Sequence, residues 1–308
     1  MKRFAARILG PGALAFPTWA YVVFFFVIPV ALVLWYSFGY KPDEFTTVAM
    51  DRLSFDRYSE ALTSSSLATF LATLRISILG TLICLIIAIP FSYWLAVKVR
   101  PERRGIMLAL VMVPFWTNFL VRTLGWQIML SNEGFVSKTL QAIGLSDGLD
   151  ILYTRTAVQI GVVYNYLPLM ILPLFVAMDA AGRQLREASY DLGAGPWKTF
   201  FTVTLPLAMP GVVSGCLLVF IPLNGDYVTA TVLGGASGSM AGQLIANQFN
   251  TAQNWALGAA MAVILMLATL IVVAVGGLLL WAGRTLMERL NSVRVRPPAS
   301  AATEGSRS

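Results

Sequence analysis

The sequence predicts an all-α, polytopic membrane protein with six transmembrane helices. Of its 308 residues 57% are hydrophobic and 12% are charged, and the mean hydropathy is +0.73, whereas a soluble domain carries about 25% charged residues. Several apolar runs approach or exceed the roughly 18 residues that cross a bilayer core of about 30 Å. The spans should be helices, because lipid offers no water to satisfy backbone groups.

In chain order, the spans are expected at roughly 17–38, 69–97, 106–125, 156–178, 208–231 and 257–283. The first follows a basic N-terminus and is too long for the apolar region of a signal peptide, so it is interpreted as a retained span. Three regions follow from this pattern. They are residues 1–68 with the first span and an exported loop, 69–283 as the main membrane domain, and 284–308 as a tail whose end, Pro297–Ser308, is expected to be disordered.

The distribution of Lys and Arg predicts the orientation. Fifteen lie in the two tails and in the loops after the second and fourth spans, whereas five lie in the loops 39–68, 126–155 and 232–256. Because positive charge favours the cytoplasmic side, both termini are expected in the cytoplasm and the protein in the inner membrane. The net charge of +7 therefore reflects topology, and no basic face indicates nucleic acid. A short interfacial helix is expected at Val136–Ile143, between Gly134 and Gly144.

The residues offer no chemistry of an enzyme. Cys84 and Cys216 both lie within apolar runs, where free thiols are usually buried, and the sequence has no histidine. The usual zinc sites are thereby excluded, and no metal site is expected. No nucleophile–base pair stands out, so no catalytic residue is assigned.

The loop before the fifth span has the pattern of two short helices. Leu185, Ala188, Ser189 and Leu192 are spaced to share one helical face, Gly193 and Gly195 interrupt the helix, and Pro196 suits the first position of a second helix. Leu205–Pro206 is expected to end that helix at the membrane. The result is a helix–turn–helix along the cytoplasmic surface, with an apolar side that fits a groove in a partner.

This loop, at about 180–206, resembles the EAA loop of the membrane subunits of bacterial ABC importers. Glu187, Ala188, Gly193, Leu205 and Pro206 match the family's pattern, and Ser189 stands where a second Ala is usual. The resemblance covers roughly residues 68–283. It implies the type I importer permease fold and identifies these six residues as the surface that couples the membrane domain to an ATPase.

The same resemblance implies the partners: a second, homologous permease, two ABC ATPase subunits, and a periplasmic or surface-tethered binding protein, all assembled in membrane lipid. This chain is expected to bind no cofactor, and ATP with magnesium belongs to the ATPase subunits. The segment Gly193–Thr199 is only superficially like a phosphate loop, because Trp197 stands where a glycine must precede the lysine.

Three further segments resemble the spermidine/putrescine permeases within that family. They are Val113–Asn118 followed by Arg122, Met209–Val219, and Gly225–Thr229 followed by Leu233–Gly235. The resemblance implies a polyamine substrate. An opine, iron, sulfate or thiamine remains an alternative cargo for the same class of importer. A secondary transporter or channel is the rival class, disfavoured by the few charges within the spans and by the EAA-like loop.

Asp226 lies in the fifth span, where a charge is costly and often faces a polar path. With Asn224 and Tyr227 beside it, it suits an ammonium group through ion pairing and cation–π contact. Candidates for the same path are Trp116, Asn118 and Tyr164. The alternatives are a structural ion pair of Asp226 with Arg75 or Arg122, packing roles for the aromatic residues, and bonds between helices for Asn118 and Asn165.

Two features of the spans concern how the helices pack. Prolines lie inside the spans at 29, 90, 114, 168, 173 and 222, where they kink helices and free carbonyl groups. Gly211 and Gly215 have the spacing of a close helix–helix contact.

Overall fold

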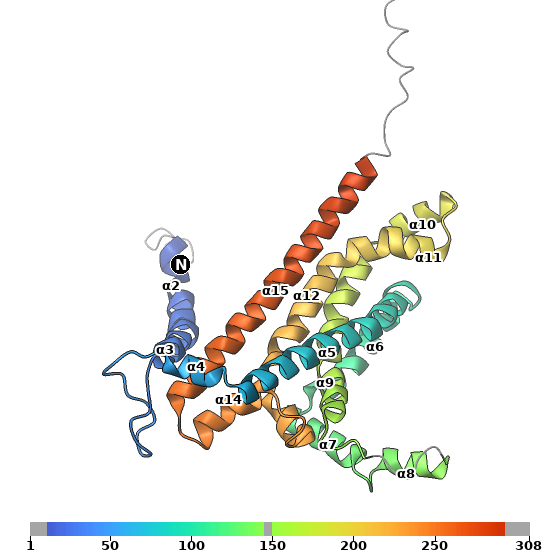
Figure 1. Cartoon of the computed structure of the whole chain (residues 1–308). Helices are drawn as coiled ribbons and strands as arrows, with labels where there is room; N and C mark the ends of the chain where they lie inside the picture. The colour runs from blue at the N-terminus through green and yellow to red at the C-terminus, as the bar shows by residue number, and fades with distance from the viewer. Residues whose placement is uncertain (1–10, 145–149, 293–308) are drawn as a thin grey trace, which may run out of the picture. The chain divides into compact units, whose positions relative to one another are not determined.

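The computed structural model describes residues 11–144 and 150–292 (Figure 1). The N-terminal basic residues and the tail Pro297–Ser308 lie outside the described residues. The elements, with η marking π-helical turns, are α2 (Pro11–Val22), η1 (Val23–Val27), α3 (Ile28–Tyr36), α4 (Asp56–Ala61), α5 (Ser64–Val97), α6 (Pro101–Trp116), α7 (Phe119–Leu130), α8 (Phe135–Ala142), α9 (Arg155–Ala180), α10 (Arg183–Asp191), α11 (Pro196–Thr199), η2 (Phe200–Thr204), α12 (Leu205–Asn224), α13 (Tyr227–Thr229), η3 (Ala230–Gly234), α14 (Ala241–Asn250) and α15 (Trp255–Ser292).

The all-α prediction is confirmed. In the described ranges the only extended pairing is a single bridge between Tyr40 and Ala49. The chain divides into two compact units, Met1–Leu265 and Met266–Ser308, and the described part of the second is the later portion of α15. The short helix expected at 136–143 is confirmed as α8, which follows Gly134.

Five helical stretches are long and apolar enough to span a membrane, and a bent pair of helices makes up to six. The five are Ala15–Tyr36, Ser64–Val97, Arg155–Ala180, Pro196–Asn224 and Trp255–Gly283. They overlap the expected first, second, fourth, fifth and sixth spans. The second begins at 64 rather than 69, and the fifth is displaced at both ends, since it runs over 196–224 rather than 208–231.

The third span was expected as one helix over 106–125, and this is wrong. α6 ends at Trp116, and the helical segment that begins at Phe119 is bent from it by 86°. The cause is local: Thr117 is extended (ψ 156°), and the Asn118 side chain then accepts from the N–H groups of Leu120 and Val121. A new helix therefore starts with its own cap two residues after the old one ends.

The fifth span also differs from its predicted range of 208–231. Its helix ends at Asn224, and the extended Asp226 (ψ 98°) separates it from the short α13 and η3. At the other end, Leu205–Pro206 does not terminate the preceding helix, because α11, η2 and α12 follow one another without a gap from 196 to 224. The π-helical turn η2 ends at Thr204, two residues before Pro206, and such local adjustments give new partners to backbone groups that a proline leaves unbonded.

The main core lies where α5, α9 and α12 pack side by side (Figure 1). Leu95, Met170, Leu174 and Val219 are fully buried there. A smaller cluster joins α4, α5 and α14 to the start of α15 through Ala61, Phe70, Ala241, Leu257, Met261 and Leu265.

The paired glycines of α12 explain how closely α12 approaches α9. A Cβ atom at Gly211 would lie 2.5 Å from the carbonyl oxygen of Pro173, and one at Gly215 would lie 2.8 Å from the sulfur of Met170. Both distances are shorter than van der Waals contact. The expectation of a close helix contact at these glycines is confirmed, and the contact requires the absence of side chains.

Replacing Gly211 by alanine should therefore destabilise the protein, by about 1–3 kcal/mol for overpacking against backbone that cannot move aside. The matched control is Gly105→Ala in α6, where a Cβ atom meets nothing within 4 Å and alanine favours the helix. Thermal unfolding of the detergent-purified protein should show a lower midpoint for Gly211→Ala only. Equal midpoints for the two variants would contradict the contact.

Candidate coupling surface and substrate path

The loop between α9 and α12 folds as the predicted helix–turn–helix. Gly193 ends α10 with φ +79°, a left-handed conformation that glycine adopts without a steric penalty. The two short helices are then joined by a hydrogen bond between the hydroxyl groups of Ser189 and Thr199, which lie 3.0 Å apart. The N–H of Ala194, in the turn, donates to the carbonyl of Ser189 at 3.1 Å and closes the end of α10.

One side of this loop is attached to the membrane helices. Phe200 meets the ring of Tyr93 edge-on, with centroids 5.0 Å apart, and Arg186 is buried. Nearby, Arg104 forms an ion pair with Asp179 and thereby joins α6 to the end of α9. The loop is therefore in contact with α5 and continuous with α12.

The other side carries exposed apolar residues, which we call the coupling patch: Leu185, Tyr190, Leu192, Trp197 and Phe201. Leu192 is 89% exposed and Trp197 is 76% exposed, and the Trp197 ring stacks on Phe201 at 6.3 Å. Exposed apolar residues gathered on one element are typical of a surface that a partner protein covers.

The predicted coupling residues lie on or beside this patch. Glu187 and Ala188 are exposed, and Glu187 accepts a hydrogen bond at 2.5 Å from the guanidinium of Arg183. Ser189 bonds to Thr199 and Ala194 and so stabilises the turn between α10 and α11. Leu205 and Pro206 occupy the first turn of α12, some distance along the chain from the helix–turn–helix.

The predicted path residue Asp226 lies within a chain of buried hydrogen bonds. It is 6% exposed, and its two carboxylate oxygens accept from the backbone N–H (2.9 Å) and the hydroxyl (2.6 Å) of Thr229. The Asn165 amide donates to the same Thr229 hydroxyl at 3.4 Å and to Thr123 at 3.2 Å. The Asn165 oxygen in turn accepts from Nε of Arg122 at 2.7 Å. We call these five residues the polar network.

Asp226 is thus linked to Arg122 indirectly. Among the ion pairs that the structure gives for the described residues, none joins Asp226 to Arg75 or Arg122. Arg122 also donates to the carbonyl of Pro114 at 2.8 Å and lies over the rings of Phe115 and Phe119. The network therefore joins the break between α6 and α7 to the break between α12 and α13, with α9 between them.

The other path candidates fall into two groups. Two of them bond within or at the end of their own helices. Asn118 is the N-terminal cap of α7, and the amide of Asn224 donates to the carbonyl of Phe220 at 2.8 Å. Tyr164 packs edge-on against Trp126, with centroids 5.2 Å apart.

Trp116 and Tyr227 instead remain accessible. Trp116 is 75% exposed at the end of α6, and Tyr227 is 52% exposed directly after Asp226. Of the predicted path candidates, these two have the most exposed aromatic rings.

Sequence reasoning missed Thr229 and Thr123 as members of the network. The available signal was Asp226 itself, because Asp is among the preferred N-cap residues, whose side chain bonds the N–H of the residue two or three positions on, here Thr229.

The described residues form membrane-length helices, one bent helix pair, and a helix–turn–helix that presents an apolar patch. This is the arrangement of a membrane-embedded subunit that a partner protein contacts. Residues 8–284 match the family model described as "Binding-protein-dependent transport system inner membrane component". The chain belongs to this family.

Its similarity to individual relatives extends over most of its length. It is 38% identical to the spermidine/putrescine transport system permease protein PotB of Haemophilus influenzae over 79% of this chain and 85% of the relative. It is 35% identical to PotB of Escherichia coli K12 over 80% of this chain and 88% of the relative.

A solved structure shares the fold. It is that of a bacterial alginate ABC transporter in complex with an alginate pentasaccharide-bound periplasmic protein, with a TM-score of 0.68, 15% sequence identity, and coverage of 85% of this chain and 90% of that chain. The fold is the type I ABC importer permease fold.

The polar network generates a prediction about stability. Asn165→Ala should remove the acceptor of Nε of Arg122, while Arg122 keeps its bond to Pro114 and the Thr229 hydroxyl keeps its bond to Asp226. The loss of this hydrogen bond to a charged group should cost about 1.5–3 kcal/mol. The control is Thr139→Ala in α8, whose hydroxyl donates only to a carbonyl of its own exposed helix. A thermal midpoint that falls for Asn165→Ala and stays unchanged for Thr139→Ala is expected. A thermal midpoint that falls more for Thr139→Ala than for Asn165→Ala would show that the polar network does not stabilise the protein.

Proposed function

We propose that this chain is a permease subunit of an ATP-driven importer that carries a polyamine of the spermidine or putrescine type into the cytoplasm. The observation that carries the cargo assignment is the extent of the similarity to the spermidine/putrescine permeases, at 38% and 35% identity over about four-fifths of the chain. An opine, iron, sulfate or thiamine is the alternative within the same class of importer.

The proposed orientation places both termini and the coupling patch in the cytoplasm, in accord with the distribution of positive charge. The patch then faces a separate ATPase subunit, which binds ATP with magnesium, and this chain binds no nucleotide. Closure of two such ATPase subunits on ATP draws the coupling loops together. Because the loop continues as one helical stretch into α12, that movement reaches the membrane helices.

The proposed assembly also contains a second permease, related to this one, and a binding protein on the exported side. The first span offers a large surface for such contacts or for lipid, since none of the span from Ala15 to Tyr36 is buried within the chain. A solved transporter of the same fold was captured with a periplasmic protein bound, which supports delivery of substrate from that side.

For the path itself, Asp226 supplies a carboxylate between two broken helices, and Tyr227 supplies an exposed ring beside it. The carboxylate attracts an ammonium group through charge, and the ring attracts it through cation–π contact. Exchange of the Thr229 hydrogen bonds for bonds to the substrate would release Asp226 from its role as a cap.

Uptake of radiolabelled spermidine and putrescine into proteoliposomes tests this function, with the assembled complex in the membrane, loaded binding protein outside and ATP inside. Uptake that requires ATP is expected. Uptake that proceeds without ATP and follows an ion gradient would establish the secondary transporter. ATP hydrolysis stimulated only by a binding protein loaded with another compound would overturn the polyamine assignment.

The role of Asp226 is tested by Asp226→Asn in the same assay. Asparagine is also a good helix cap, and its single oxygen can keep the bond from the N–H of Thr229, while the acceptor of the Thr229 hydroxyl is lost together with the charge. Polyamine uptake should fall about tenfold or more, because a contact to a charged group is worth about 1.5–3 kcal/mol, whereas the free energy of unfolding should fall by only about 1 kcal/mol for the lost hydrogen bond. Normal uptake would assign Asp226 to structure alone.

The coupling role is tested by comparing Glu187→Ala with Arg183→Ala. Both variants break the same exposed ion pair, which contributes at most about 1 kcal/mol to stability, but only Glu187→Ala removes the carboxylate offered to the ATPase. Uptake should be abolished in Glu187→Ala and largely retained in Arg183→Ala, with both complexes assembled. Equal losses would mean that the ion pair matters rather than the carboxylate.

A further inference from the structure

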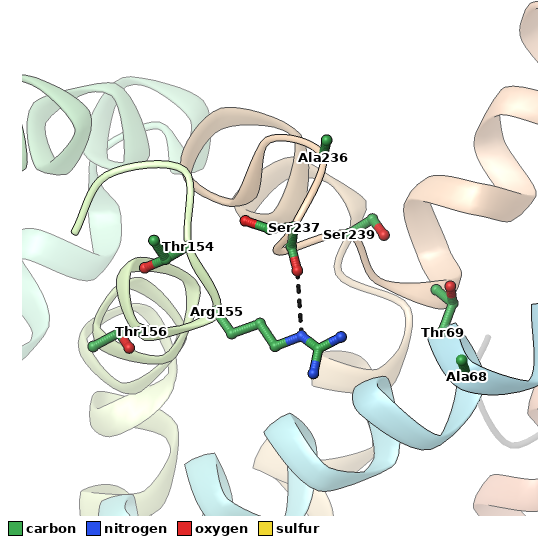
Figure 2. Close-up of a pocket in the computed structure, with 8 residues that line it drawn as sticks. All are labelled: Ala68, Thr69, Thr154, Arg155, Thr156, Ala236, Ser237 and Ser239. Atoms are coloured by element: carbon green, nitrogen blue, oxygen red, sulfur yellow. Dashed lines mark hydrogen bonds between the residues drawn. The ribbon is translucent and has the colours of Figure 1, made fainter. Parts of the chain in front are cut away.

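A polar cavity of about 610 Å³ opens at the end of the membrane domain away from the coupling loop. It lies where α9 begins, beside the N-terminal part of α5 and the segment that follows η3 (Figure 2). Its lining residues are Ala68, Thr69, Thr154, Arg155, Thr156, Ala236, Ser237 and Ser239. In the proposed orientation, this cavity faces the exported side.

The cavity wall is held in place by contacts between distant parts of the chain. The hydroxyl of Ser237 donates to the carbonyl of Tyr153 at 2.6 Å, and Nε of Arg155 donates to the carbonyl of Ser237 at 3.2 Å. Gly235 has φ +54°, and a Cβ atom there would lie 2.9 Å from the side chain of Tyr153. The segment therefore lies directly against the start of α9.

The guanidinium of Arg155 is the charged group of this cavity. Figure 2 shows its two terminal nitrogens directed into the open space, while Nε is used to anchor Ser237. The hydroxyl groups of Thr69, Thr154 and Ser237 donate to carbonyl groups within the chain, so the guanidinium is the donor group that the cavity offers to a carboxylate. An arginine whose terminal nitrogens are free can bind such a group through two parallel hydrogen bonds.

Arg155 differs in this respect from the other four cations of the predicted exported loops. Lys41 donates to the carbonyl of Ala252, Arg52 lies over the ring of Tyr40, Arg57 pairs with Glu60, and Lys138 pairs with Glu133. Among these five side chains of the described residues, Arg155 is the one whose terminal nitrogens have neither a hydrogen-bond nor an ion-pair partner.

The surroundings narrow the identity of the occupant. The three exported loops contain eight Asp and Glu residues against five Lys and Arg residues, so the face as a whole repels small free anions. A polyamine is repelled by Arg155 itself. A carboxylate that belongs to a docking protein is different, because the rest of that protein's contact surface brings it to the cavity.

We propose that this cavity receives an aspartate or glutamate side chain of the substrate-binding protein, which pairs with Arg155 when the loaded binding protein docks. This inference rests on the proposed function. It assigns to Arg155 a role in recognition of the delivery partner, apart from the substrate path and the coupling patch.

The test measures ATP hydrolysis by the assembled complex in nanodiscs as the concentration of spermidine-loaded binding protein is raised. Arg155→Glu should increase the half-stimulating concentration about tenfold, because a paired charge becomes a like charge, and Arg155→Lys should restore most of the response. Hydrolysis without binding protein should not change. Lys138→Glu makes the same charge change on the same face outside the cavity and should shift the response less than about twofold.

A second variant separates recognition from the anchoring of Ser237. Ala236→Glu leaves Arg155 and its hydrogen bond in place but offers the guanidinium a carboxylate within the chain, so it should weaken docking as Arg155→Glu does. Ala236→Gln is its neutral control and should behave as the unchanged protein. Half-stimulating concentrations that stay the same in both glutamate variants would overturn the proposal.

The two proposals fail in different ways. If no spermidine- or putrescine-loaded binding protein stimulates the unchanged complex, the polyamine assignment fails. If the unchanged complex is stimulated, and Arg155→Glu responds at the same concentrations, only the role of the cavity fails. Replacing the binding protein's surface carboxylates one at a time by arginine should yield one variant that stimulates the Arg155→Glu complex better than the unchanged complex.

Discussion

The side chain of Asn165 is the constraint on which the arrangement of the broken spans depends. Its oxygen accepts from Arg122 and its amide donates to Thr123 and Thr229, so one buried carboxamide on α9 is bonded to both neighbouring breaks. In a membrane a helix can be interrupted only where the freed polar groups find partners within the protein. Asn165 therefore fixes the segment after each interruption to the same point of α9.

Features set by local patterns could be predicted from the sequence. Long apolar runs gave the number of spans, and the spacing of Leu185, Ala188 and Leu192, followed by Gly193 and Pro196, gave the helix–turn–helix. Each of these signals lies within about twenty consecutive residues. The close approach at Gly211 and Gly215 was predictable for the same reason, although the partner helix α9 was not.

The breaks and the cavity could not be predicted in the same way. Asn118 and Asp226 were interpreted as residues of a polar path, whereas in the structure each accepts backbone hydrogen bonds as a helix cap. When only two residues leave the helical conformation, the average hydropathy of the span hardly changes. A break of this size therefore cannot be seen in the hydropathy of the sequence. The cavity around Arg155 is assembled from three segments far apart in the chain, and no single segment carries a sign of it.

The uninterrupted path from Pro196 to Asn224 has a mechanical consequence. At 1.5 Å per residue its contour is about 43 Å. The π-helical turn η2, Pro206 and Pro210 all lie in its first half, and such features are where helices bend. The later half is fixed against α9 by the close contacts at Gly211 and Gly215. The stretch is therefore a stiff shaft with a joint at its cytoplasmic end, and a displacement at Pro196 reaches Asn224 only after it has passed that joint.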